Sequence, residues 1–135
     1  MKTIEAIIEK AKDGTYSVYC VKEIFSGTGN TIEEAKDNMR EQMIFYKKTA
    51  QEEGFRYPAF LDEGYEISYA IDGISLMRYY IDGGVLTYAG LGKLTGINQK
   101  QLWSYMNGTK PRKAQKDKLL KGFQVLQREL NGIFA

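Results

Sequence analysis

The sequence predicts an α+β protein in two parts: an N-terminal β-β-β-α-β sheet with one long helix over residues 1–72, and an all-α part over residues 73–135. Apolar residues alternate in short runs within the first part, whereas from residue 86 onward they recur at three- and four-residue steps. The charge changes at the same place. Residues 1–72 hold nine Lys and Arg against fourteen Asp and Glu, a net charge of −5, and residues 73–135 hold ten against three, a net charge of +7.

Three short strands are expected at the N-terminus. Residues 3–9 and 15–21 alternate between apolar and polar side chains, and Lys12-Asp13-Gly14 joins them. Asp-Gly between two such runs is a strong signal for a β-hairpin. A third short run, residues 23–26, ends in Gly27-Thr28-Gly29-Asn30, which we interpret as a turn.

One long helix is expected over residues 31–53. Thr31 followed by Glu34 fits a capping box, and Gly54 suits the left-handed turn that ends a helix. The residues of its apolar stripe are Ile32, Ala35, Met39, Met43, Tyr46 and Ala50.

A loop containing Pro58 over residues 55–63 and a fourth strand over residues 66–71 are expected next. Residues 73–83 fit either a strand after an Asp72-Gly73 turn or a helix capped by Asp72. We favour the helix because three apolar residues share one helical face, namely Ile74, Met77 and Ile81.

Two short helices are then expected, over residues 88–94 and from the cap Asn98 to Met106, before a long final helix. Gly96 stands at the corner between them. Short helices around such a corner are typical of a helix-turn-helix, although pairs of core helices without a ligand share this pattern. The residues expected to form the apolar seam are Leu91, Leu94, Ile97, Leu102 and Met106.

The polar side chains around the second short helix favour binding to duplex DNA. The helix begins Asn98-Gln99-Lys100-Gln101, and amide and ammonium groups read base edges in the major groove. Between residues 98 and 121 there are seven Lys and Arg against one acid, Asp117. A helix pair with a purely structural role would tolerate acids on its solvent face.

Residues 91–108 resemble the Cro/C1-type helix-turn-helix of lambdoid-phage repressors, with a corner Gly, an Asn cap, a Gln-containing start and Asn-Gly at the end. The resemblance covers about 60 residues with the flanking helices, and Tyr88, Gly92 and Trp103 depart from the family pattern. It implies that Gln99, Lys100 and Ser104 face base edges. The side chains that it implies to face phosphates are Tyr88, Asn107, Lys110, Arg112 and Lys113. Trp103 is left unassigned.

The N-terminal part resembles the HicB antitoxin family, whose members have a partial ribonuclease-H-like fold. The resemblance lies in residues 12–18, Lys-Asp-Gly-Thr-Tyr-Ser-Val, and residues 29–35, Gly-Asn-Thr-Ile-Glu-Glu-Ala. The Gly-Cys stretch usual in the family is replaced by residues 20–26. The resemblance implies a type II antitoxin that neutralises a small basic HicA-like mRNA-cleaving toxin and represses its own operon at an operator. A homodimer joined through a sheet edge or helix of the N-terminal part is expected.

Two other functions stay open. One is a free-standing regulator whose N-terminal part serves dimerisation or ligand sensing. The other is a carboxylate-based hydrolase, but Asp13, Asp62 and Asp72 have no spacing that forces them to converge on a metal pair. The chain has no His and one Cys, so we expect no catalytic residues, metal or cofactor. With no signal peptide and no apolar span, a cytoplasmic protein without membrane contact is expected.

Overall fold

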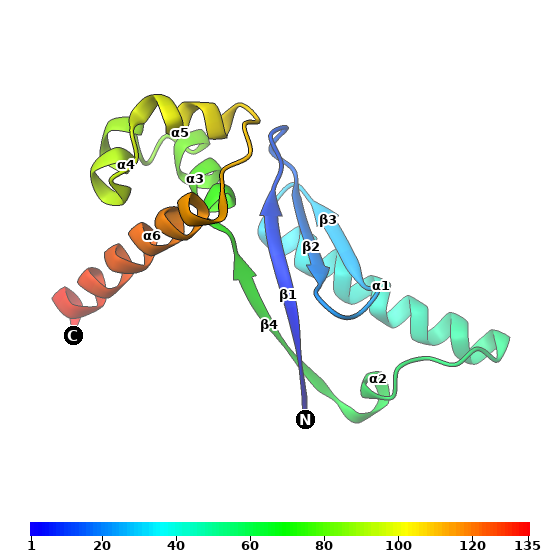
Figure 1. Ribbon diagram of the computed structural model, residues 1–135. Coiled ribbons are helices and arrows are strands. Elements are labelled where there is room, and N and C mark those ends of the chain that lie inside the picture. The colour runs from blue at the N-terminus through cyan, green and yellow to red at the C-terminus, as the bar shows by residue number, and fades with distance from the viewer. The chain divides into compact units, whose positions relative to one another are not determined.

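The computed structural model describes all residues, Met1–Ala135, and its internal contacts divide the chain into two compact units. Unit 1 is Met1–Ile71 and unit 2 is Asp72–Ala135 (Figure 1). The chain holds one four-stranded mixed sheet and six helices, so the predicted α+β class is confirmed. None of the helices combines the length and the apolar character needed to cross a membrane.

Unit 1 is built on a sheet with the strand order β3-β2-β1-β4. β2 pairs antiparallel with both β1 and β3, whereas β4 pairs parallel with β1. The long helix α1 connects β3 to β4 and packs on one face of the sheet (Figure 1). The element bounds are β1 Lys2–Lys10, β2 Tyr16–Cys20, β3 Ser26–Gly29, α1 Ile32–Glu53, α2 Phe60–Glu63 and β4 Tyr65–Ile71.

The hairpin between β1 and β2 forms at the predicted position. The backbone N–H and the hydroxyl of Thr15 donate to Oδ1 of Asp13, at 2.9 and 2.7 Å. These hydrogen bonds, led by that of the hydroxyl, hold the pKa of the Asp13 carboxyl below its usual value. Gly14 has a φ of 92°, which a residue with a Cβ rarely adopts.

A third strand precedes α1 as predicted, but its predicted bounds, residues 23–26, are wrong, because β3 is Ser26–Gly29 and includes the residues that the sequence suggests as a turn. Its glycines serve close contact with α1. A Cβ on Gly27 would overlap the backbone nitrogen of Met39, and a Cβ on Gly29 would lie 2.7 Å from the backbone nitrogen of Ala35. The two glycines therefore let β3 approach the backbone of α1.

The caps of α1 confirm the predicted bounds of the long helix. Oγ1 of Thr31 accepts a hydrogen bond from the backbone N–H of Glu34 at 3.0 Å, and the Glu34 carboxylate accepts from the N–H of Asn30 at 2.7 Å. Gly54 ends the helix in the left-handed conformation, with a φ of 75°. The fully buried side chains on its inner face are Ala35, Met39 and Met43.

The predicted loop over residues 55–63 is wrong at its end, where Phe60–Glu63 forms the short helix α2. The N–H of Leu61 donates to the carbonyl of Pro58 at 3.1 Å, which closes the turn. Phe60 is buried and meets the rings of Phe25 and Tyr65 edge to face. Burial of this one ring stabilises a turn too short to show helical periodicity in the sequence.

Unit 2 consists of four helices: α3 Gly73–Asp82, α4 Tyr88–Thr95, α5 Gln99–Met106 and α6 Lys113–Phe134. The predicted helix over residues 73–83 is confirmed as α3. Asp72 caps it as expected, because its Oδ1 accepts a hydrogen bond from the N–H of Ser75 at 2.7 Å. The buried side chains of its core are Met77, Leu91, Ile97, Leu102, Tyr105, Leu119 and Phe123.

Candidate functional site

The corner between α4 and α5 is held by a side chain as well as by glycine. Gly96 ends α4 with a φ of 74°. The hydroxyl of Thr95 donates to the carbonyl of Leu91 at 2.8 Å and accepts from the N–H of Ile97 at 3.2 Å. The buried Thr95 therefore satisfies backbone groups on both sides of the turn, which favours one fixed angle between the helices.

The seam between these helices agrees in large part with the expected set. Leu91, Ile97 and Leu102 are buried, and Leu94 and Met106 are half-buried.

Tyr105 also belongs to this seam and is only 3% exposed, although it is absent from the set expected from the sequence. Its hydroxyl accepts a hydrogen bond from Nε2 of Gln101 at 2.9 Å. A tyrosine three residues after the buried Leu102 is the signal that could have found it.

The start of α5 presents two polar side chains to solvent. Asn98 caps the helix, with Oδ1 accepting from the N–H of Lys100 at 2.8 Å. The side chains of Gln99 and Lys100 are exposed and make no hydrogen bond or ion pair within the chain. Ser104 is half-buried, and its hydroxyl donates to the carbonyl of Lys100 at 3.0 Å. Ser104 therefore offers an acceptor to a ligand, whereas Gln99 offers both a donor and an acceptor.

Trp103 lies one helical turn after Gln99 and is 57% exposed, so the two side chains share one side of α5. The resemblance to the helix-turn-helix family assigns this residue no role. The four-residue spacing from Gln99 is the signal that places it on the polar face of α5. It is the only tryptophan of the chain.

The five side chains expected at phosphates differ in their surroundings. Tyr88 begins α4 and packs half-buried against the core of unit 2. Nδ2 of Asn107 donates to a backbone carbonyl of α5 at 2.9 Å. Lys110, Arg112 and Lys113 are exposed around the start of α6.

A polar groove of about 560 Å³ runs beside α5 and brings together part of this set. Lys110 and Arg112 line it, together with Lys118 of α6. The amine of Lys118 lies 3.9 Å from the position of a Cβ on Gly96, so it reaches the corner between α4 and α5. The amide side chains that line the groove are Asn98, Gln101 and Gln115. Cations and amides on one concave surface suit an anion with several oxygen atoms.

The cations of this surface form no ion pairs with acids of the chain. Unit 2 holds ten Lys and Arg against four Asp and Glu, a net charge of +6. None of the seven Lys and Arg between residues 98 and 121 takes part in an ion pair. Their charge is therefore available to attract a polyanion.

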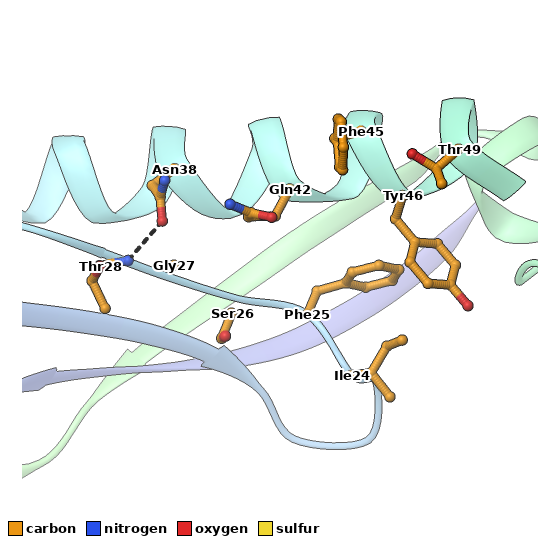
Figure 2. A pocket seen from close by; sticks show the side chains of 10 residues that line it. All are labelled: Ile24, Phe25, Ser26, Gly27, Thr28, Asn38, Gln42, Phe45, Tyr46 and Thr49. Atoms are coloured by element: carbon orange, nitrogen blue, oxygen red, sulfur yellow. Dashed lines mark hydrogen bonds between the residues drawn. The ribbon is translucent and has the colours of Figure 1, made fainter.

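Unit 1 has a separate groove of about 460 Å³ between β3 and α1 (Figure 2). Tyr46 extends from α1 toward Phe25, and the ring centroids lie 5.4 Å apart. At the other end, Oδ1 of Asn38 accepts from the backbone N–H of Thr28 at 3.0 Å. Phe45 lines the groove and is 65% exposed. The groove is therefore apolar at one end and polar at the other.

The three carboxylates considered for a hydrolase each have a local structural role. Asp13 holds the hairpin and Asp72 caps α3. Oδ1 of Asp62 lies 2.7 Å from Nζ of Lys47, and Tyr57 donates to the same carboxylate at 2.9 Å. Hydrogen bonds from Lys47 and then from Tyr57 lower the pKa of Asp62, and the same contact raises the pKa of Lys47. No group of three His, Cys, Asp or Glu side chains could hold a metal ion.

No protein-family model, no curated protein and no solved structure matches this chain.

Proposed function

We propose that unit 2 is a helix-turn-helix DNA-binding domain, with α4 as the scaffold helix and α5 as the recognition helix. The observation that carries this proposal is the pair of exposed, unpartnered side chains at the start of α5, Gln99 and Lys100. An amide suits the two groups of an adenine edge, and an ammonium suits the acceptors of guanine. The Thr95 hydrogen bonds at the corner hold α5 in a fixed position, which base readout requires.

The polar groove beside α5 supplies the proposed contacts to the DNA backbone. Lys110, Arg112 and Lys118 line it without acidic partners, and phosphate contacts fix the register of a protein on a duplex. Lys113 and Asn107 flank this surface in the sequence, and Tyr88 begins the scaffold helix. We assign these side chains to phosphates as well.

For the whole chain we propose a type II antitoxin that binds and neutralises a small basic HicA-like toxin through unit 1. Unit 2 would bind the operator and repress the operon. The HicB resemblance of residues 12–18 and 29–35 supports the toxin partner. So does the charge of unit 1, which holds nine Lys and Arg against thirteen Asp and Glu, a net charge of −4.

The second candidate is a free-standing regulator, and the groove of unit 1 favours it. Its volume of about 460 Å³ falls within the range of small-molecule sites, and its walls combine aromatic rings with amides. In this function a small amphipathic molecule in the groove would regulate DNA binding by unit 2. Co-expression with the product of the adjacent gene, followed by affinity capture, distinguishes the two candidates. Only an antitoxin should be captured in a complex with that product.

The emission of Trp103 tests the DNA-binding proposal directly. It is the only tryptophan, and it shares the exposed side of α5 with Gln99. Titration with duplex from the region upstream of the gene should change its emission, with an affinity that falls steeply as salt rises because bound phosphates release counterions.

Two exposed lysines form a matched pair for this titration. Lys110→Ala should weaken binding and reduce the salt dependence by about one released ion, whereas Lys48→Ala on α1 should leave both unchanged. Emission that no duplex changes at low salt would contradict a recognition role for α5.

A further inference from the structure

Trp103 lies in the middle of α5, on the side that faces away from the core of unit 2. The two buried side chains of this helix are Leu102 and Tyr105, which belong to that core. Because successive residues of a helix are about 100° apart, Trp103 lies about 130° around the helix axis from the midpoint of these two side chains. Its indole is 57% exposed, so it takes little part in the packing of unit 2.

The indole of Trp103 has no polar or aromatic partner within the chain. Its N–H donates no hydrogen bond, and its rings contact no other aromatic ring and no cation. The hydrogen bond that Asn107 donates at 2.9 Å goes to the backbone carbonyl of Trp103 and leaves the side chain free. The interactions inside the chain therefore do not account for a large aromatic side chain at this position.

Polar side chains surround this indole on α5. Gln99 and Lys100 precede Trp103 by four and three residues, and Asn107 follows it by four, so all three are its neighbours on the helix surface. No other large apolar side chain between Val85 and Leu130 is exposed. Sites for protein partners present a contiguous apolar patch, whereas this surface presents one apolar group among amides and a cation.

The major groove of duplex DNA offers the complementary arrangement. The base edges there carry hydrogen-bond donors and acceptors, and their one apolar group is the C5-methyl of thymine. Phosphates border the groove, and the seven Lys and Arg between residues 98 and 121 are free of ion pairs. The surroundings of Trp103 therefore match this surface in charge as well as in polarity.

We propose that Trp103 contacts the C5-methyl group of a thymine and makes the chain select thymine at that position of its DNA site. This assignment rests on the proposed DNA-binding function of unit 2. Gln99 and Lys100, one turn before Trp103, take the hydrogen-bonding groups of neighbouring base pairs. The burial of one methyl group contributes about fourfold in affinity, which is the size of the selectivity that we expect.

Replacing thymine by deoxyuracil tests the contact, because it removes the methyl group and keeps the hydrogen-bonding groups of the base. The probe is a duplex that the full chain selects from a random-sequence pool, with one thymine replaced at a time. At the contacted position the parent chain should lose about fourfold in affinity. Trp103→Ala should bind the thymine and deoxyuracil duplexes with affinities that differ by less than about 1.5-fold, because the methyl group has lost its partner.

Two further variants separate the indole from the rest of α5. Lys100→Ala should weaken binding to both duplexes and keep the fourfold difference of the parent, because an ammonium does not contact the methyl group. Trp103→Phe keeps an apolar ring and should retain part of the difference. A variant that is partly unfolded loses the same factor on both duplexes, so the ratio of the two affinities still reports the contact.

The outcomes distinguish the thymine contact from the DNA-binding function. A selection that enriches no sequence would overturn the DNA-binding function and the contact with it. An enriched duplex that tolerates every deoxyuracil, or that responds equally with the parent and with Trp103→Ala, would overturn the contact alone. A response that disappears in Lys100→Ala as well as in Trp103→Ala would also overturn it, because the methyl dependence would then not belong to the indole.

Discussion

Gly122 of α6 approaches Thr95 of α4 so closely that a Cβ on the glycine would lie 2.9 Å from Cγ2 of the threonine. The same Cβ would lie 3.1 Å from the carbonyl oxygen of Leu94. Because Thr95 also holds the corner before α5, the contact between α4 and α6 determines where the corner lies. The absent side chain of Gly122 is therefore part of what positions α5.

Replacement of Gly122 by Ala should destabilise unit 2. The added methyl overpacks a contact with backbone atoms, which typically costs about 1–3 kcal/mol and outweighs the gain of up to about 1 kcal/mol in helix propensity. Gly132→Ala in the same helix is the control, because its Cβ would have no atom within 4 Å, and it should be neutral or slightly stabilising. Urea unfolding followed by Trp103 emission measures both. Equal stability of the two variants would refute the close contact.

Gln99→Ala and Arg112→Ala should separate base readout from phosphate binding. The first should weaken binding to the operator by about 1–3 kcal/mol and relax the sequence preference, because an amide reads base edges. The second should weaken binding to operator and random duplexes alike, because phosphates carry no sequence information. Competition between the two duplexes measures the difference. If both variants lose the same factor on both duplexes, Gln99 is not a base reader.

Local signals were sufficient to predict most of the helices and strands. The capping box at Thr31, the Asp72 cap and the Asp-Gly hairpin each depend on residues within about four positions of one another. Such short-range chemistry can be recognised in a single sequence, and the structure confirms these elements.

The errors have long-range causes. Gly27 suggests a turn in the sequence because glycines are common in turns, yet it lies in β3, where its lack of a Cβ allows close contact with the backbone of α1. α2 forms because Phe60 is buried against Phe25, which is 35 residues away in the sequence, as well as against the nearby Tyr65.

In the candidate site, the buried Tyr105 and the exposed Trp103 depend on which side of α5 meets the core. The apolar Leu102 and Met106 indicate that side, but tyrosine and tryptophan have both apolar rings and polar groups, so their residue type alone does not assign them to the core or to solvent.

The contact between Lys47 and Asp62 should make the stability of unit 1 depend on acid pH. Because the pKa of Asp62 is lowered on folding, its contribution is present above the usual carboxyl pKa of 3.8 and is lost as the pH falls through the folded value. Asp62→Asn should therefore reduce the loss of stability between about pH 5 and about pH 2. Urea midpoints by circular dichroism measure this.

Glu63→Gln is the control for that experiment. Glu63 neighbours Asp62 in α2 and takes part in no ion pair. Its replacement should leave the acid dependence close to that of the parent. If the Asp62 variant loses as much stability in acid as the parent does, the ion pair makes no contribution.

Toxin binding by unit 1 should be separable from DNA binding by unit 2. If unit 1 binds the adjacent gene's product, replacing Lys110, Arg112 and Lys113 together by Ala in the full chain should abolish repression and leave neutralisation intact. The physical reason is that the substitutions lie in unit 2, on an exposed surface outside the core of unit 1. A chain ending at Ile71 should also restore growth when that product is expressed, provided that circular dichroism shows it to be folded. Co-expression followed by affinity capture measures the complex. A folded protein that captures no neighbour-encoded partner would exclude the antitoxin function, and the regulator, with its ligand in the groove between β3 and α1, would then be the better account.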